Sequence, residues 1–218
     1  MAKILIVSPH ADDEIIGCGG MMARHGDDNE IDVVIMALGC PRANAQVPAS
    51  LRIKEMNAAH KLLSINSTAI VYRNQSGFLD EIPMFDIVGE LDKILDRGYD
   101  EVYYPAICHM HDHAIVNKAC HAALRPGAHW PMPRLVAEYE HNWPGWSSVE
   151  GNLYLKLQEK DVLKKMAAMK CYQSQLSRHS DIKQHPISLV AIMQMLEMRG
   201  YECGCNYAER YNMVYGQV

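Results

Sequence analysis

Short apolar runs alternate with segments of helical periodicity along the first 124 residues, and this alternation constrains the fold more than any other feature. The apolar runs are rich in β-branched residues and have the character of buried strands, whereas the segments between them place apolar residues at helical spacing. The expected strands are 4–8, 31–38, 68–72 and 101–104, and the expected helices are 12–25, 49–65, 83–97 and 112–124. This order predicts an α/β fold with a mostly parallel sheet and helices on both faces.

The pattern is less regular after residue 124. We expect strands at 135–140 and 153–157 and helices at 161–176 and 187–198. No internal repeat or long linker divides the sequence, and a length of 218 residues suits one domain. We therefore expect a single domain spanning residues 1–218.

The bulk composition excludes several classes of partner. The net charge of −5 gives no basic surplus for nucleic acid or an anionic membrane. No stretch approaches the ~20 apolar residues of a membrane-spanning helix, and the first apolar run is too short for a signal peptide. The seven cysteines are scattered without a CxxC pair, and the Cys203-Gly-Cys205 spacing is tighter than structural zinc sites use. Reduced thiols and the absence of a leader make a cytoplasmic location the expectation.

Two polar clusters follow predicted strands. The first strand runs directly into His10-Ala-Asp12-Asp13-Glu14, and the fourth opens into a stretch with three histidines and one aspartate, 109–113. Ligands of open α/β sheets bind beyond the carboxyl ends of the strands. Both clusters are therefore expected at the same edge of the sheet.

The residue types in these clusters indicate metal chemistry. Adjacent carboxylates repel unless a cation or a proton offsets them. A helix N-terminus would explain Asp12, Asp13 and Glu14, but not His10, and a solvated His-rich loop would explain the second cluster alone. Two histidines and one carboxylate with an open position form a familiar catalytic zinc arrangement.

Such an ion lowers the pKa of bound water and polarises a carbonyl, and the remaining carboxylate can act as general base. This chemistry suits amide hydrolysis. The sequence contains neither Gly-x-Ser-x-Gly nor the G-x-G-x-x-G dinucleotide fingerprint.

Motifs along nearly the whole chain resemble those of the LmbE-like, or PIG-L, N-acetylglucosaminyl deacetylases. The most specific is the opening motif, PHADDEIIGCGG at 9–20. Later segments are similar to the family's R-x-x-E helix, G-F-x-D turn, second metal motif, S-Q helix and terminal Y-A-E segment, at Arg52–Glu55, Gly77–Asp80, Asp112–His113, Lys170–Gln175 and Gly204–Glu209.

The resemblance implies a Rossmann-like three-layer fold and a zinc-dependent hydrolase that removes the acetyl group of an N-acetylglucosamine-type sugar or conjugate. It implies that His10, Asp13 and His113 bind Zn²⁺, although the same ligands can hold other divalent transition metals. It also implies that Asp12 is the general base. The family often forms trimers or hexamers, so a homo-oligomer is expected.

Two further roles follow from the resemblance. Asp112 would orient a neighbouring histidine and so tune its basicity. Arg52 would bind substrate oxygens; alternatively, Arg52 and Glu55 are an ordinary pair on a helix surface.

The second metal motif departs from the family pattern D-x-H-x-D-H. Met110 stands where the family has a histidine that stabilises the oxyanion or protonates the leaving amine, and a methionine can do neither. His111 is the candidate to replace it, with His109 as the alternative. The departure also leaves open an amidase for a non-sugar amide or a metal-binding relative with weakened turnover.

Aromatic residues between the strands expected at 135–140 and 153–157 allow two interpretations. Trp143 and Trp146, beside His141, would form either a wall for a sugar ring or a buried anchor for the loop.

Overall fold

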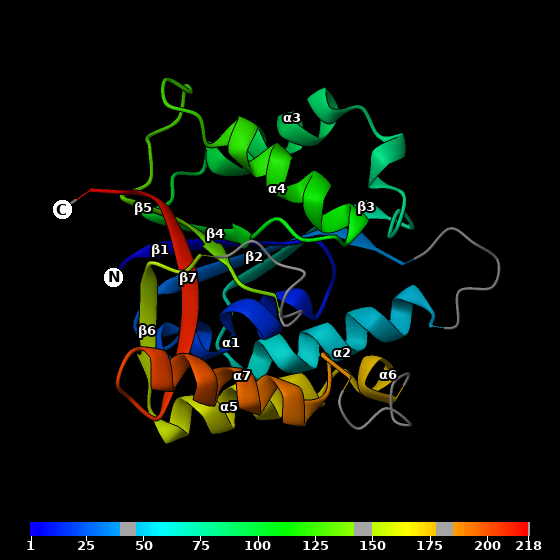
Figure 1. The fold of residues 1–218 in the computed structure, drawn as a ribbon. Coiled ribbons are helices and arrows are strands. Elements are labelled where there is room, and N and C mark those ends of the chain that lie inside the picture. Colours follow the sequence, from blue (N-terminus) through cyan, green and yellow to red (C-terminus); the bar gives the residue numbers. More distant parts are fainter. Residues whose placement is uncertain (40–46, 142–149, 178–184, 218) are drawn as a thin grey trace.

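A seven-stranded sheet organises the residues that the computed structural model describes, which are 1–39, 47–141, 150–177 and 185–217 (Figure 1). The strand order is β3-β2-β1-β4-β5-β7-β6. The parallel part contains β1 (Lys3–Ser8), β2 (Glu30–Leu38), β3 (Ser67–Arg73), β4 (Glu101–Pro105) and β5 (Leu135–Tyr139). The last strand, β7 (Tyr207–Gly216), lies antiparallel between β5 and β6 (Leu153–Leu157).

Helices cover both faces of this sheet, which makes a three-layer α/β fold (Figure 1). On one face lie α3 (Met84–Leu95) and α4 (His111–Ala123), preceded by a short 3-10 helix at Leu79–Glu81. On the other face lie α1 (Asp13–His25), α2 (Ala49–Leu62), α5 (Glu159–Lys170), α6 (Gln173–Ser177) and α7 (Leu189–Glu202). The predicted α/β architecture with a mostly parallel sheet is thereby confirmed.

Each face of the sheet carries its own apolar core. Side chains of a strand alternate between faces, so Ile4 and Ile6 of β1 enter the core beneath α1, α2 and α5, whereas Leu5 and Val7 enter the core beneath α3 and α4. All four are buried. A strand buried on both faces reads as a continuous apolar run, which is why the sequence identified it so clearly.

Two expectations for the C-terminal part are corrected. The helix expected at 161–176 is interrupted between Lys170 and Gln173, where the buried Tyr172 turns its hydroxyl inward. The strand β7 was not expected, because Glu209 and Arg210 break its apolar pattern. Both charges are paired inside the protein, Glu209 with Lys165 and Arg210 with Glu140.

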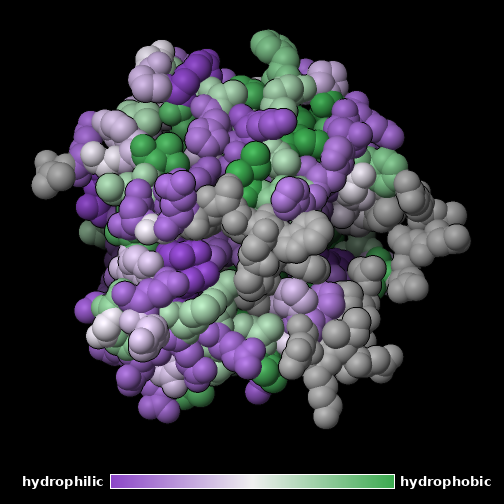
Figure 2. All heavy atoms as spheres, viewed as in Figure 1, coloured by the Kyte–Doolittle hydropathy of each residue, from purple (hydrophilic) through white to green (hydrophobic). Residues whose placement is uncertain are grey.

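Polar and apolar residues are interspersed on the face seen in Figure 2. The most exposed large apolar side chains include Phe85 at the start of α3 and Tyr201 at the end of α7. Among the described residues, no helix is both long and apolar enough to span a bilayer.

Candidate metal centre

Neighbouring parallel strands bring the two polar clusters of the sequence together. β1 pairs with β4, and each is followed by a turn that leads into the N-terminus of a helix. His10 lies in the turn that follows β1, and Asp13 is the first residue of α1. His113 lies in the first helical turn of α4. The expected convergence at one edge of the sheet is therefore present.

His10, Asp13 and His113 form a compact group that fits a divalent ion. One donor atom from each lies within 4.8 Å of the others. Asp13 Oδ2 is 3.3 Å from His10 Nδ1 and 3.1 Å from His113 Nε2. Tetrahedral zinc with bonds of about 2.0–2.1 Å separates its ligands by roughly 3.3 Å. The donor types and the two distances from Asp13 to the histidines match such an ion.

The histidine His113 supplies a second argument for a cation. Its side chain is fully buried, yet neither ring nitrogen has hydrogen-bond geometry to a described partner. Buried polar atoms are normally hydrogen-bonded, and a metal ligand is one explanation for an exception. The Nε2 atom of His113 accordingly lies beside Asp13 and can bind an ion once its proton is released.

In the metal-free chain, protons on the histidines supply part of the positive charge that an ion would bring. Burial lowers the pKa of His10, but hydrogen bonds to Asp112 and Asp13 outweigh it and raise the pKa to about 8. Burial likewise lowers the pKa of His113, and the charge of Asp13 raises it to about 10. Burial raises the pKa of Asp13, yet His113, His10 and His141 together hold it well below its usual range. The pocket therefore favours positive charge beside an ionised Asp13.

Asp112 fixes the orientation of His10. Its Oδ2 is 2.8 Å from His10 Nε2 and accepts a hydrogen bond of 2.5 Å from Gly77 N–H. An ionised carboxylate only accepts, so His10 donates to Asp112 through Nε2 and turns Nδ1 toward Asp13; in the neutral ring Nδ1 is then the nitrogen that can bind an ion. The contact supports the orienting role that the resemblance implies for Asp112, and the role itself stays a prediction.

Asp12 is a buried carboxylate held in a strained backbone. Its φ of 124° lies in a region that residues other than glycine rarely adopt. It is the N-cap residue of α1, but its side chain makes no cap hydrogen bond. The carboxylate instead lies 3.6 Å from Arg52 Nη2. Burial raises the pKa of Asp12 to about 7, against the opposing charge of Arg52.

The fully buried Glu14 stabilises the strained turn at Asp12 through hydrogen bonds. Its Oε2 accepts the backbone N–H of Asp12 at 2.9 Å, and its Oε1 accepts the Tyr172 hydroxyl at 2.5 Å. His60 Nε2 lies 3.1 Å from the same Oε1. The interruption between α5 and α6 therefore matters to the site, since it places Tyr172 against the turn that carries Asp12.

Arg52 and Glu55 are not a pair on the helix surface. Arg52 donates to the carbonyl of Ala11 and faces Asp12, whereas Glu55 accepts from the N–H and hydroxyl of Ser174 at the start of α6. Arg52 therefore reaches the same edge of the sheet as the histidines.

His141, which follows β5, belongs to the site although the sequence did not predict it there. This histidine is buried, and its Nε2 lies 2.9 Å from Asp13 Oδ1. With Asp13 ionised, His141 donates this bond and leaves Oδ2 to face His10 and His113. Its position directly after a parallel strand was the feature that could have identified it.

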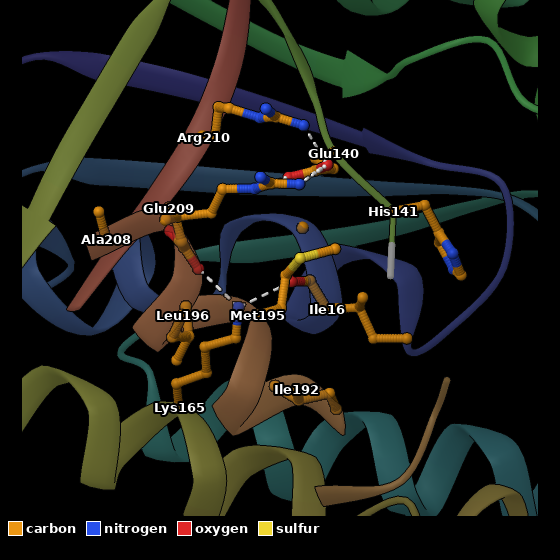
Figure 3. A pocket seen from close by; sticks show the side chains of 12 residues that line it. Ile16, Glu140, His141, Lys165, Ile192, Met195, Leu196, Ala208, Glu209 and Arg210 are labelled. Atoms are coloured by element: carbon orange, nitrogen blue, oxygen red, sulfur yellow. Dashed lines mark hydrogen bonds and ion pairs between the residues drawn. The ribbon is translucent and has the colours of Figure 1, made fainter. Parts of the chain in front are cut away.

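The neighbouring Glu140 anchors the segment that carries His141. Its Oε1 accepts from Arg199 Nη2 at 2.6 Å and from Arg210 Nη2 at 2.5 Å. In Figure 3, Glu140 points toward Arg210 at one wall of a small pocket, while His141 points the other way. Charged anchors on α7 and β7 therefore fix the end of β5 and, with it, the contact of His141 with Asp13.

The structure does not bring His111 to this group. Its side chain is 62% exposed, and its Nε2 lies 3.1 Å from Asp80 Oδ1. Met110 is the N-cap residue of α4. Trp143 and Trp146 lie outside the described residues.

Solved structures with the same fold carry different activities. The conserved protein TT1542 from Thermus thermophilus has 22% identity and a TM-score of 0.79, covering 100% of this chain and 97% of that one. The N,N'-diacetylchitobiose deacetylase from Pyrococcus horikoshii has 20% identity and a TM-score of 0.78, covering 98% and 84%. The 4-carboxy-2-hydroxymuconate hydratase GalB from Pseudomonas putida KT2440 has 18% identity and a TM-score of 0.76, covering 100% and 98%. At these identities the likeness shows the fold alone.

Sequence comparison identifies the family. No curated protein matches the chain significantly. The profile of the family described as GlcNAc-PI de-N-acetylase (PIG-L) matches residues 5–124, which is more than half of the 218 residues and includes both polar clusters. The chain therefore belongs to the PIG-L family of GlcNAc-PI de-N-acetylases.

Proposed function

We propose that this protein is a metal-dependent N-deacetylase that hydrolyses the acetamide of an N-acetylglucosamine-type sugar or conjugate. The observation that carries the proposal is the convergence of His10, Asp13 and His113 beside the buried Asp12. The family and the diacetylchitobiose deacetylase with the same fold support an acetylated sugar as the substrate.

His10, Asp13 and His113 would hold the ion, for which zinc is the first candidate. When bound, such an ion acts as a Lewis acid that lowers the pKa of water and polarises a carbonyl oxygen. Asp112 and His141 keep the ligands in place, because each fixes one of them by a hydrogen bond.

Asp12 is the general base in this proposal. It takes the proton of the water that attacks the acetyl carbon, and the C–N bond breaks as the amine nitrogen gains a proton. A carboxyl with a pKa near 7 can both accept and return a proton at neutral pH. Asp12 is therefore our candidate both for taking the proton from water and for giving one to the amine. With both steps assigned to Asp12, the reaction needs no histidine at position 110.

Arg52 is the candidate for substrate binding. Its guanidinium lies between the carbonyl of Ala11 and the carboxylate of Asp12, and it is partly buried. In this position its charge limits the rise of the Asp12 pKa, and its remaining donors suit hydroxyl or phosphate oxygens.

The test is acetate release by zinc-loaded protein from a panel of N-acetylated sugars and simple amides. We expect release from a sugar and a loss of at least about 100-fold in the Asp12→Asn variant with metal still bound. Release only from non-sugar amides would favour the amidase alternative. Full metal content without release from any substrate would favour a metal-binding relative that has lost turnover.

A further inference from the structure

The turn between α7 and β7 holds two thiols in contact. Cys203 Sγ lies 3.5 Å from Cys205 Sγ, and both side chains are half-buried. Cys203 Sγ is 3.7 Å from the carbonyl of Gly200, and Cys205 Sγ is 3.2 Å from that of Tyr207. These contacts lie within the turn itself, so the proposed deacetylation does not account for the pair of sulfurs.

The helix cap fixes this arrangement. Cys203 is the C-cap residue of α7, and Gly204 follows it with a φ of 71°, a left-handed conformation that glycine adopts without strain. Cys205 N–H donates to the carbonyl of Gly200 at 2.9 Å, and Gly204 N–H donates to that of Tyr201 at 3.4 Å. These two bonds form a Schellman motif, so the cysteines flank a turn held by its own backbone.

The turn is open to small molecules. Gly204 is exposed, and the side chain of Tyr201, one turn earlier, is 88% exposed. A disulfide needs an S–S distance of about 2.05 Å, so closure would bring the two sulfurs about 1.5 Å nearer to each other than in their present contact. In the described part of the chain, no other two cysteines make such a sulfur–sulfur contact.

We propose that Cys203 and Cys205 form a dithiol site that a small-molecule disulfide oxidises reversibly to an internal disulfide. One protein thiolate attacks the small disulfide, forms a mixed disulfide and releases the first small thiol. The second cysteine then attacks the protein sulfur of the mixed disulfide and releases the second thiol. The protein loses two protons and two electrons, and the small disulfide gains them and is reduced to two thiols.

Glutathione disulfide is the probe for this step. Because burial and the neighbouring Cys205 raise the pKa of the Cys203 thiol, the folded protein is treated at mildly alkaline pH. Free thiols are then alkylated, the protein is digested, and the masses of the peptides are measured by mass spectrometry. We expect the peptide with both cysteines to lose two hydrogens and to carry neither an alkyl group nor glutathione, and a reductant to restore both thiols.

Variants separate closure from simple thiol reactivity. Cys203→Ser and Cys205→Ser should each stop at one bound glutathione, because the second thiol is missing, whereas Cys171→Ser should close the disulfide as the wild type does. Two glutathiones on the wild-type turn, or two alkylated cysteines after prolonged treatment, would overturn the proposal. Closure only in denatured protein would also overturn it, since the folded cap would then not prepare the pair.

Discussion

Asp13 is contacted by three histidines that come from three parts of the chain. His10 and His113 face its Oδ2, and His141 donates to its Oδ1. A carboxylate so surrounded stays ionised, and its free rotation is removed. At the scale of single residues, the candidate site is therefore a preformed anionic ligand with its partners already oriented.

His141 is expected to matter for metal affinity although it is not in the ligand group. Partners that orient ligands typically contribute about 10–100-fold in affinity, so His141→Ala should weaken zinc binding by that range and His10→Ala by more. Competition with a chromophoric chelator measures both. The exposed His111→Ala is the matched control and should bind as the wild type does; equal affinities for His111→Ala and His141→Ala would refute the orienting role.

Metal affinity should rise with pH up to about 10, the higher of the two histidine pKa values. Below about pH 8 His10 is protonated in the metal-free chain, because its hydrogen bonds to Asp112 and Asp13 outweigh burial, and only the neutral imidazole can bind an ion. His113, with a pKa of about 10, also loses a proton on binding. Calorimetry at pH 7 in buffers of different ionisation enthalpy should show proton release. Identical heats in all buffers would contradict this charge assignment.

At the scale of helices and strands, much of the architecture followed from local patterns. Buried runs such as 4–8 and 101–104 identified parallel strands, and the carboxyl ends of these two strands located His10, Asp13 and His113 at one edge. β7 was not predicted, because its Glu209 is buried only with an ion-pair partner, Lys165, that lies 44 residues away in the sequence. His141 was not predicted as a site residue, because its contact with Asp13 joins residues 128 positions apart in the sequence.

The close approach of α1 to β5 depends on Gly17. A Cβ built there would lie 2.1 Å from Tyr139 Cδ2, and Tyr139 is itself held by a hydrogen bond to the carbonyl of Val7. We therefore expect Gly17→Ala to lower the free energy of unfolding by about 1–3 kcal/mol. Chemical denaturation measures the change.

Gly89 provides the matched helical control. Nothing lies within 4 Å of a Cβ built there, so Gly89→Ala should stabilise the protein by about 0.5–1 kcal/mol through helix propensity alone. If both alanine variants changed stability alike, close packing at Gly17 would not be the reason for its glycine.

At the scale of the whole molecule, the C-terminal strand locks onto the first helix. Glu209 of β7 accepts the backbone N–H groups of Gly20 and Met21, at 2.6 and 2.7 Å, and pairs with the buried Lys165 of α5. The segments that hold the candidate metal ligands are thus hydrogen-bonded to segments far along the chain. Binding at the candidate site should consequently stabilise the fold as a unit.

Zinc should raise the melting temperature, and a chelator should lower it. A ligand at 100 times its Kd that binds only the folded state adds about 2.7 kcal/mol, which corresponds to roughly 5–10 °C for a chain of this size. Calorimetric or fluorescence melting with and without zinc measures the shift. His10→Ala should abolish it; a shift of the same size in that variant would place the bound ion elsewhere.

The most direct measurement is a crystal structure of the zinc-loaded protein with anomalous scattering recorded at the zinc edge. The proposal predicts one strong peak within about 2.0–2.2 Å of a His10 nitrogen, an Asp13 oxygen and a His113 nitrogen. An occupied zinc site at another position, with no peak among these three residues, would contradict it.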